Sequence, residues 1–543
     1  MLRKFFLYTV IVLQLPLITL TQAINAKSST QKPKLVVGLV IDQMRWDFLY
    51  RYNDLYTANG FKRLLKDGYS CENMLIPYMP TYTAPGHTCV YTGSVPAIHG
   101  IVGNNWFDKT TGTGVYCTED DAVETIGSNT IAGKMSPKNL WATTITDELR
   151  IATNFKSKVI GIAVKDRGAI LPTGHSANAA YWYDGEEGKW ISSTYYMKEL
   201  PVWVNDFNAN DFPAKYMSKS WNLDTVKSLY IQSTEDNMRF EGNILGDEGV
   251  VFPHQLASIK TGRYEAFKTT PFANTFTFDF AKEVVKNEQL GNNSVPDFLT
   301  VSISSTDYIG HTFGPNSMEI EDTYLKLDKD IADFLQYLDK VVGKDNYLFF
   351  LTADHGVAHV PAFLTQHAIP AGVGNDAGLL TKMNQLVADK FSVKNAVTTI
   401  MNYQLYLGNF PIDKRKEITS FLIAELKKQP SIVDAMELEK ISEATLPEPQ
   451  KSMMINGYTP NRSGEIQFVF KPGYFNGGTK GTTHGLWNPY DAHIPLLFYG
   501  WNVKQGKTNR ETYMTDIAAT IAAMLQIQMP SGCVGKVITE VIK

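Results

Sequence analysis

The sequence predicts an α/β fold, with a central, mostly parallel sheet flanked by helices. Continuous apolar, β-branched runs recur along the chain, and amphipathic helical stretches lie between several of them. Strands that are buried on both faces of a parallel sheet have such continuous runs, without alternation of apolar and polar residues. Strands that alternate with helices in this way predict right-handed crossovers within one sheet.

The predicted strands follow from these apolar runs. The clearest is Lys34–Ile41 (KLVVGLVI), which has the length and the β-branched content of a buried strand. Similar runs recur at Val159–Val164, Phe298–Ile303, Tyr347–Leu351 and Ile494–Tyr499. Together they predict a sheet whose strands come from both halves of the chain.

Helices and insertions fill the rest of the sequence. The clearest amphipathic stretches are Asn139–Ile151, Met318–Val342 and Asp516–Leu525. Residues about 170–290 are rich in Trp, Tyr, Asn and Ser, and residues about 362–480 mix helical pattern with Pro and Gly. We expect both of these stretches to be insertions that cap the C-terminal edge of the sheet.

The amino terminus has the features of a secretory signal peptide, Met1–Ala26. Arg3 and Lys4 form a basic start, and Phe5–Leu20 is almost wholly apolar. The alternative is an uncleaved membrane anchor, but the run is short for a bilayer span and Pro16 interrupts it. We therefore expect export to the periplasm or the medium, with no membrane span after cleavage.

Residues 27–543 then form one catalytic domain with the two insertions. Its composition, 44% hydrophobic and 20% charged over the whole chain, is that of a globular protein. The formal charge of −4 gives no basic surface for nucleic acid. The four cysteines, Cys71, Cys89, Cys117 and Cys533, allow three complete pairings, and buried free thiols are equally compatible with the sequence.

Three aspartates and three histidines lie at the ends of predicted strands or just before the last one. They are Asp42, Asp307, His311, Asp354, His355 and His484. A single strand-terminal Asp is often only a helix cap, but six such residues at one sheet edge suit two zinc ions. Asp307 and His311 are four residues apart, so one helical turn points both the same way.

The segment Pro80–Thr88 predicts a turn that enters a helix. Pro85 suits a first helical turn, and Thr83 would lie at the helix start, where backbone N–H groups favour an anion. A threonine hydroxyl is a weak nucleophile unless a metal activates it. From this segment alone, a simple N-cap role for Thr83 is the stronger interpretation.

Four stretches together resemble the alkaline phosphatase superfamily. Thr83–His87 (TAPGH), followed by His99–Asn105 (HGIVGNN), resembles its nucleophile region, and the phosphodiesterase branch has a similar pattern. Asp42–Asp47 (DQMRWD) and Lys165–Arg167 (KDR) resemble the PafA-type periplasmic alkaline phosphatases. The resemblance runs from about residue 34 to the C-terminus.

The resemblance implies a site for each predicted residue. One zinc ion would be held by Asp307, His311 and His484, and the other by Asp42, Asp354, His355 and the Thr83 oxygen. Thr83 would form a phosphothreonine intermediate, while Asn104, Lys165 and Arg167 would clamp the phosphoryl oxygens. The implied activity is hydrolysis of phosphate monoesters by a monomeric alkaline phosphatase.

Lys165 and Arg167 favour monoesters over diesters. A monoester dianion has three free oxygens for cations to grip, whereas a diester has one oxygen blocked and one charge less. Because the two residues follow a strand and are two apart, we expect them to face the same side of an extended chain. The alternatives are a solvated surface pair, a nucleotide pyrophosphatase/phosphodiesterase on the same scaffold, or a non-catalytic exported binding protein.

Overall fold

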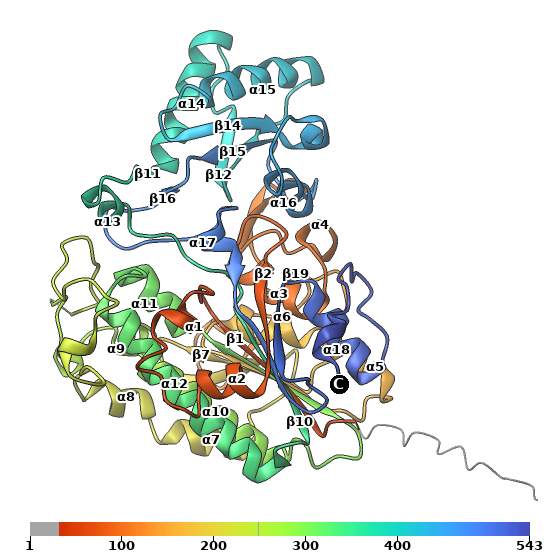
Figure 1. The fold of residues 1–543 in the computed structure, drawn as a ribbon. Helices are drawn as coiled ribbons and strands as arrows, with labels where there is room; N and C mark the ends of the chain where they lie inside the picture. Colours follow the sequence, from red (N-terminus) through yellow and green to blue (C-terminus); the bar gives the residue numbers. More distant parts are fainter. Residues whose placement is uncertain (1–31, 248) are drawn as a thin grey trace, which may run out of the picture. The chain divides into compact units, whose positions relative to one another are not determined.

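A computed structural model describes residues 32–247 and 249–543, so the predicted signal peptide lies outside the described residues. Within them, the main sheet has 11 strands in the order β17-β2-β18-β10-β1-β9-β6-β7-β8-β5, with β19 beside β2 (Figure 1). The strands are β1 (Leu35–Ile41), β2 (Tyr69–Leu75), β5 (Thr125–Ile126), β6 (Val159–Ala163), β7 (Ala179–Asp184), β8 (Lys189–Ser193), β9 (Asp297–Ile303), β10 (Tyr347–Thr352), β17 (His493–Ile494), β18 (Leu496–Gly500) and β19 (Gly506–Tyr513). All five predicted runs form strands, but Ile494–Tyr499 is divided at Pro495 into β17 and β18, since proline has no N–H for the ladder.

The directions of the strands differ between the centre and the flanks. The central strands β10, β1, β9, β6 and β7 are parallel, with Val37 of β1 opposite Phe349 and Leu299. In contrast, β18 runs antiparallel to β10, and β8 runs antiparallel to β7. The prediction of a mostly parallel sheet therefore describes its centre, because the short β7–β8 connection can join only antiparallel strands.

The sheet is flanked by helices whose bounds largely follow the predicted ones. The helices outside the second insertion are α1 (Phe48–Arg51), α2 (Phe61–Asp67), α3 (Thr83–Thr92), α4 (Pro96–His99), α5 (Ile145–Ala152), α6 (Asp166–Thr173), α7 (Val202–Ala209), α8 (Phe212–Met217), α9 (Arg263–Phe267), α10 (Phe272–Asn287), α11 (Ser305–Phe313), α12 (Met318–Leu338), α17 (Pro489–Ala492) and α18 (Asp516–Leu525). The predicted helix at Asn139–Ile151 begins only at Ile145, because Thr144 and Asp147 form a capping box there.

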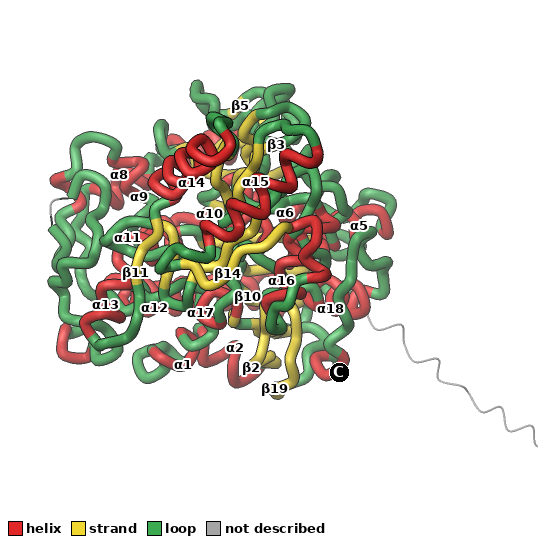
Figure 2. Tube along the Cα trace, turned by 90° about the horizontal axis from the view of Figure 1, so that it is seen from above, coloured by secondary structure: helices red, strands yellow, loops and turns green. Residues whose placement is uncertain are grey.

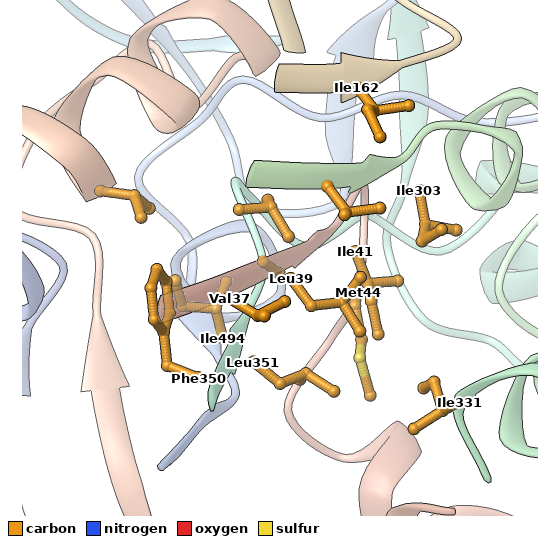
Figure 3. Packing of buried hydrophobic residues seen from close by; sticks show 14 of the residues in the cluster. Val37, Leu39, Ile41, Met44, Ile162, Ile303, Ile331, Phe350, Leu351 and Ile494 are labelled. Carbon is orange, nitrogen blue, oxygen red and sulfur yellow. The ribbon is translucent and has the colours of Figure 1, made fainter. Parts of the chain in front are cut away.

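Strand β1 lies at the centre of the main hydrophobic core. All seven of its residues are buried. Figure 3 shows Val37, Leu39 and Ile41 beside Phe350 and Leu351 of the neighbouring β10. A strand that is buried on both faces has a continuous apolar sequence, and for this reason the run could be predicted as a buried strand.

The two predicted insertions differ in architecture. The first supplies β7 and β8 to the main sheet, so this pair extends the sheet and does not cap it. The second builds a separate four-stranded sheet, in the order β12-β13-β15-β14, with its own hydrophobic core. In Figure 2, β14 lies beside α15. Its elements are β11 (Gly372–Gly374), β12 (Val397–Met401), β13 (Gln404–Leu407), β14 (Ile432–Glu437), β15 (Ile466–Phe470), β16 (Tyr474–Asn476), α13 (Pro361–Gln366), α14 (Asp376–Phe391), α15 (Ile412–Leu426) and α16 (Gln450–Gly457).

A small hairpin packs against the start of α3. Strands β3 (Asn105–Asp108) and β4 (Thr113–Tyr116) form a two-stranded sheet, and Trp106 of β3 shares a hydrophobic cluster with Ala84. All four cysteines are free thiols, and Cys533 is the most exposed of them. No helix among the described residues is long and apolar enough to cross a membrane.

Candidate active site

The six candidate metal ligands meet at one edge of the main sheet. Asp42 directly follows β1, α11 after β9 carries Asp307 and His311, and Asp354 with His355 follows β10. His484 precedes β17 and β18, and because β18 is antiparallel to β10, its start lies at the edge where β10 ends. The sheet therefore brings together residues from nearly the whole described chain at the place where α/β sheets bind ligands.

The first group surrounds a carboxylate oxygen of Asp307. His311 Nε2 lies 3.1 Å from Asp307 Oδ1, and His484 Nε2 lies 3.6 Å from the same atom. Each histidine directs its Nδ1 at a backbone carbonyl, His311 at Thr482 O (2.8 Å) and His484 at Thr81 O (2.7 Å). A carbonyl only accepts, so Nδ1 carries the proton and each Nε2 offers a lone pair to a cation.

The second group surrounds His355. Its Nε2 lies 3.5 Å from Asp42 Oδ1, 3.4 Å from Asp354 Oδ2 and 3.4 Å from Thr83 Oγ1. His355 Nδ1 lies 2.9 Å from Gly356 O, which again leaves Nε2 as the free ligand atom. Asp42 Oδ1 is buried and accepts no hydrogen bond from any residue that the structure describes. A buried carboxylate oxygen without a partner fits a site for a cation.

Asp307 connects the two groups. Ligand atoms of Asp307, His311 and His484 lie within 4.8 Å of one another, and so do those of Asp42, Asp307 and His355. The predicted assignment gives Asp307 to one ion and Asp354 to the other, and this division stays a prediction. Two adjacent clusters of this kind suit a pair of metal ions.

Burial and crowding set the protonation of these groups. Burial, followed by repulsion from Asp354, raises the pKa of Asp42 well above its ordinary value. Burial alone would also raise the pKa of Asp307, but His311 and Lys165 outweigh it and hold that pKa well below its usual range. Burial and the neighbouring His355 lower the pKa of His484, so this imidazole is neutral and able to bind a metal.

Thr83 is the first residue of α3 and is almost fully buried. The N-cap of that helix is Tyr82, and its side chain makes no capping hydrogen bond, so Thr83 is not an N-cap. Asn104 Oδ1 accepts a hydrogen bond from Ala84 N (2.9 Å), which leaves the Asn104 amide Nδ2 as a donor at the same helix start. The His87 ring contacts the same helix start, because its Nδ1 lies 2.9 Å from Thr83 O.

The backbone at Lys165 and Arg167 differs from the predicted extended chain. The chain turns into α6 immediately after Lys165, so the expectation of an extended pair facing one side is wrong. Lys165 Nζ lies 2.7 Å from Asp42 Oδ2 and also contacts Asp307. Because its side chain is only 2% exposed, Lys165 is not a solvated surface residue.

Arg167 is held by residues that the sequence did not reveal. Its Nη1 donates to the Tyr116 hydroxyl (3.0 Å), which donates to Asp166 Oδ1 (2.7 Å). Thr118 donates to the other oxygen of Asp166. Hairpin β3–β4 ends at Tyr116, and no local pattern in the sequence marks this residue as a partner of α6.

Residues 36–493 match the family described as type I phosphodiesterase / nucleotide pyrophosphatase. The chain belongs to this family. It is 50% identical to alkaline phosphatase PafA of Elizabethkingia meningoseptica, over 95% of each chain. It is 51% identical to alkaline phosphatase PhoV of Synechococcus elongatus, over 94% of this chain and 93% of the relative. It is also 51% identical to a protein of Myroides odoratus described as a calcium-transporting ATPase, over 96% of this chain and 97% of the relative.

Solved structures of the family agree with the fold. The crystal structure of wild-type alkaline phosphatase PafA superposes with a TM-score of 0.92 at 49% identity, over 94% of this chain and 99% of that chain. A second PafA structure, of a variant with a substituted threonine, asparagine, lysine and arginine, gives the same TM-score of 0.92. This chain is similar to alkaline phosphatases over nearly its full length, and it is therefore a phosphatase.

Proposed function

We propose that this protein is an exported alkaline phosphatase that hydrolyses phosphate monoesters with Thr83 as its nucleophile and two zinc ions as cofactors. The observation that carries the proposal is the position of Thr83 Oγ1. It is buried at the start of α3, 3.4 Å from Nε2 of His355, a candidate ligand of the second group. A hydroxyl in such surroundings is placed for metal-assisted attack on an anionic substrate.

The donor set fits zinc. The proposed ligands are Asp307, His311 and His484 for one ion, and Asp42, Asp354, His355 and Thr83 for the other. When bound, the ions would supply positive charge that favours the Thr83 alkoxide and neutralises the charge of the phosphoryl oxygens. Carboxylate oxygens and imidazole nitrogens are normal zinc ligands, and a hydrogen bond from the other ring nitrogen fixes each imidazole tautomer.

The residues of the chain perform two substitutions at phosphorus. In the first, the Thr83 hydroxyl loses its proton to solvent and Oγ1 forms a bond to phosphorus while the bond to the leaving oxygen breaks; that oxygen takes up a proton from solvent, and a phosphothreonine results. In the second, a water oxygen forms a bond to that phosphorus and loses a proton, the bond to Thr83 breaks, Thr83 Oγ1 regains a proton, and phosphate leaves. The Asn104 amide, Lys165 and Arg167 donate hydrogen bonds to the non-bridging oxygens in both steps.

We call Asn104, Lys165 and Arg167 the phosphate clamp, and two observations support its preference for monoesters. In the variant of the PafA structure, the four substituted residue types are those of Thr83, Asn104, Lys165 and Arg167, in the same order along the chain. This correspondence supports a shared site. Burial alone would lower the pKa of Lys165, but Asp307 and Asp42 raise it, so the lysine stays charged for a dianionic substrate.

The second candidate function is a nucleotide pyrophosphatase/phosphodiesterase, which the description of the matching family names. A comparison of kcat/KM for an aryl phosphate and for its methyl diester separates the two. We expect the monoester to be strongly preferred. A preference for the diester would overturn the proposed function and favour the phosphodiesterase.

Export is proposed from Met1–Ala26, and a periplasmic or secreted monomer is expected. Sequencing the amino terminus of the protein recovered from the cell exterior tests the export. A mature chain that begins shortly after Ala23 or Ala26 supports it, whereas an intact Met1 contradicts it.

A further inference from the structure

A two-residue turn of the second insertion contacts the chain beside Asn104 and the loop that carries His484. Strands β12 and β13 form a hairpin in which Met401 pairs with Gln404, so Asn402 and Tyr403 make up the whole turn. Both have left-handed backbone angles, with φ of 56° and 61°. Asparagine tolerates this conformation in tight hairpin turns, but a tyrosine there is uncommon and costs conformational energy. Backbone strain of this kind persists where the surroundings hold it in place.

Asn402 touches the residues on both sides of Asn104. Its Nδ2 donates to Asn105 O at 2.9 Å, and a Cβ added to Gly103 would come within 2.6 Å of the same nitrogen. A side chain at position 103 would therefore displace the Asn402 amide from its present position. Because Asn104 is joined to both contacted residues, Asn402 restricts the position from which Asn104 can donate to a phosphoryl oxygen.

Tyr403 touches the metal-ligand loop and the nucleophile segment. Its hydroxyl donates to His484 O at 3.2 Å. Its ring stacks on Tyr82, the residue before Thr83, with centroids 6.4 Å apart and an interplanar angle of 22°. The Tyr82 ring in turn meets the His484 ring edge-on, with centroids 5.5 Å apart. One side chain therefore packs against the backbone of a candidate zinc ligand and the neighbour of the nucleophile.

The turn is itself firmly held by the insertion. Gln467 Nε2 and Phe468 N both donate to Tyr403 O, at 2.8 and 3.1 Å. The Tyr403 ring packs edge-on against Phe468 and Phe470 of β15. The side chain is only 3% exposed, so it cannot move without disturbing the core of the insertion.

We propose that Asn402 and Tyr403 are positioning residues, through which the second insertion sets the geometry of the phosphate clamp and of the metal site. Asn402 acts through Asn104, and Tyr403 acts through His484 and Tyr82. This role rests on the proposed function, since it requires Asn104 to bind phosphate and His484 to bind zinc. The second insertion therefore contributes to the geometry of the site. Its turn fixes the Asn104 amide and the His484 imidazole relative to each other.

The test for Asn402 is a double-mutant cycle with Asn104 in the zinc-loaded enzyme. Asn402→Gly removes the amide and keeps the left-handed backbone. We expect it to lower kcat/KM for an aryl phosphate by about 2- to 10-fold, the range of one lost hydrogen bond. In an Asn104→Ala background the same change should have almost no further effect, because its target is gone.

Asn384→Ala is the matched control. Asn384 also donates its amide to a backbone carbonyl, Val397 O at 3.0 Å, but inside the insertion. We expect kcat/KM to stay unchanged in this variant while the melting temperature falls. Equal losses from Asn402→Gly in both Asn104 backgrounds would overturn the proposal. Full activity of Asn104→Ala alone would instead show that the clamp of the proposed function is wrong, and the role of Asn402 with it.

Tyr403→Phe tests the other contact, because it removes one hydroxyl and keeps the ring. We expect zinc to be lost to a chelator about 3- to 10-fold faster, in line with the loss of a partner that orients a metal ligand. Tyr337→Phe is its control, since Tyr337 donates to Lys282 O at 2.9 Å, away from the site. If the two tyrosine variants release zinc at the same rate, Tyr403 does not position His484.

Discussion

The two insertions differ in what they pack against. The first adds β7 and β8 to the main sheet and buries aromatic rings, with Trp190 stacked on Phe276 and Phe280 at centroid distances of 5.0 and 4.5 Å. The second folds around its own sheet and contacts the site through Asn402 and Tyr403. An insertion that extends a core contributes to stability, whereas one that contacts a site from a separate core can adjust the chemistry.

Neither insertion contains a candidate metal ligand or the candidate nucleophile, and the largest effect is expected where these residues lie. Removal of the metals with a chelator should abolish activity while the fold remains, because all six candidate ligands lie at the edge of the main sheet or on the loop before β17. Metal analysis should find about two zinc ions per chain, as two adjacent sites require. Asp354→Ala should lose zinc and activity together. Full activity in the metal-free protein would end the two-zinc hypothesis.

The next largest effect is expected at the nucleophile. Thr83→Ala should lower kcat by several orders of magnitude and leave the fold and the metal content largely intact. Thr81→Ala is the matched control, since the Thr81 hydroxyl donates to Leu486 O and has no predicted ligand role. The assignment is wrong if both variants lose activity equally, or if Thr81→Ala loses more.

A smaller but more specific effect is expected for the clamp. Replacing both Lys165 and Arg167 by alanine should lower kcat/KM for monoesters steeply, on the order of 10²-fold or more per residue. Diesters should lose much less, because they present fewer oxygens and less charge. Since Lys165 also contacts Asp42 and Asp307, zinc content is measured in the same variant. An unchanged ratio of monoester to diester activity would contradict the clamp.

The smallest effects on activity are expected in the insertions, where one substitution in each distinguishes an effect on catalysis from an effect on stability. Arg462 of the second insertion donates to Gly100 O (2.6 Å), shortly before Asn104 in the chain, and to Asn139 O (2.9 Å). Arg462→Ala should lower kcat/KM about 3- to 10-fold, the range of one or two lost hydrogen bonds. Trp190→Ala in the first insertion should cost about 3–5 kcal/mol of stability in denaturant unfolding and leave kcat unchanged. A loss of kcat in Trp190→Ala, with unchanged kcat/KM in Arg462→Ala, would show that the first insertion and not the second affects the chemistry.

The sequence predicted the parts of this site that depend on local pattern. Asp42 and Asp354 were identifiable because each follows a continuous apolar run, and the end of a strand is a fixed place in a parallel sheet. The strand at Ile494–Tyr499 was also predicted, but its direction was not, because apolar periodicity is the same for parallel and antiparallel strands. The helical start of Lys165–Arg167 was missed for a similar reason, since a residue pair two apart does not reveal where a helix begins.

Other parts depend on contacts between residues that are far apart in the sequence. Tyr116 holds Arg167 across 51 residues, and Asn402 reaches Asn105 across 297. Nothing in the local sequence around Asn402 and Tyr403 indicates a partner in the nucleophile region. The turn itself was recognisable in principle, because Asn lies between two short apolar stretches, but its place beside the site is set by the packing of the whole insertion.

The late position of His484 in the chain has a consequence for how the site forms. Asp42 follows the first strand of the described chain, whereas His484 comes just before one of its last strands. Almost the whole polypeptide must therefore be present before the candidate ligand set can close, and the ends of such a long loop meet slowly. A chain that stops before His484 lacks one of the six candidate ligands, so the candidate site is complete only when β18 has docked.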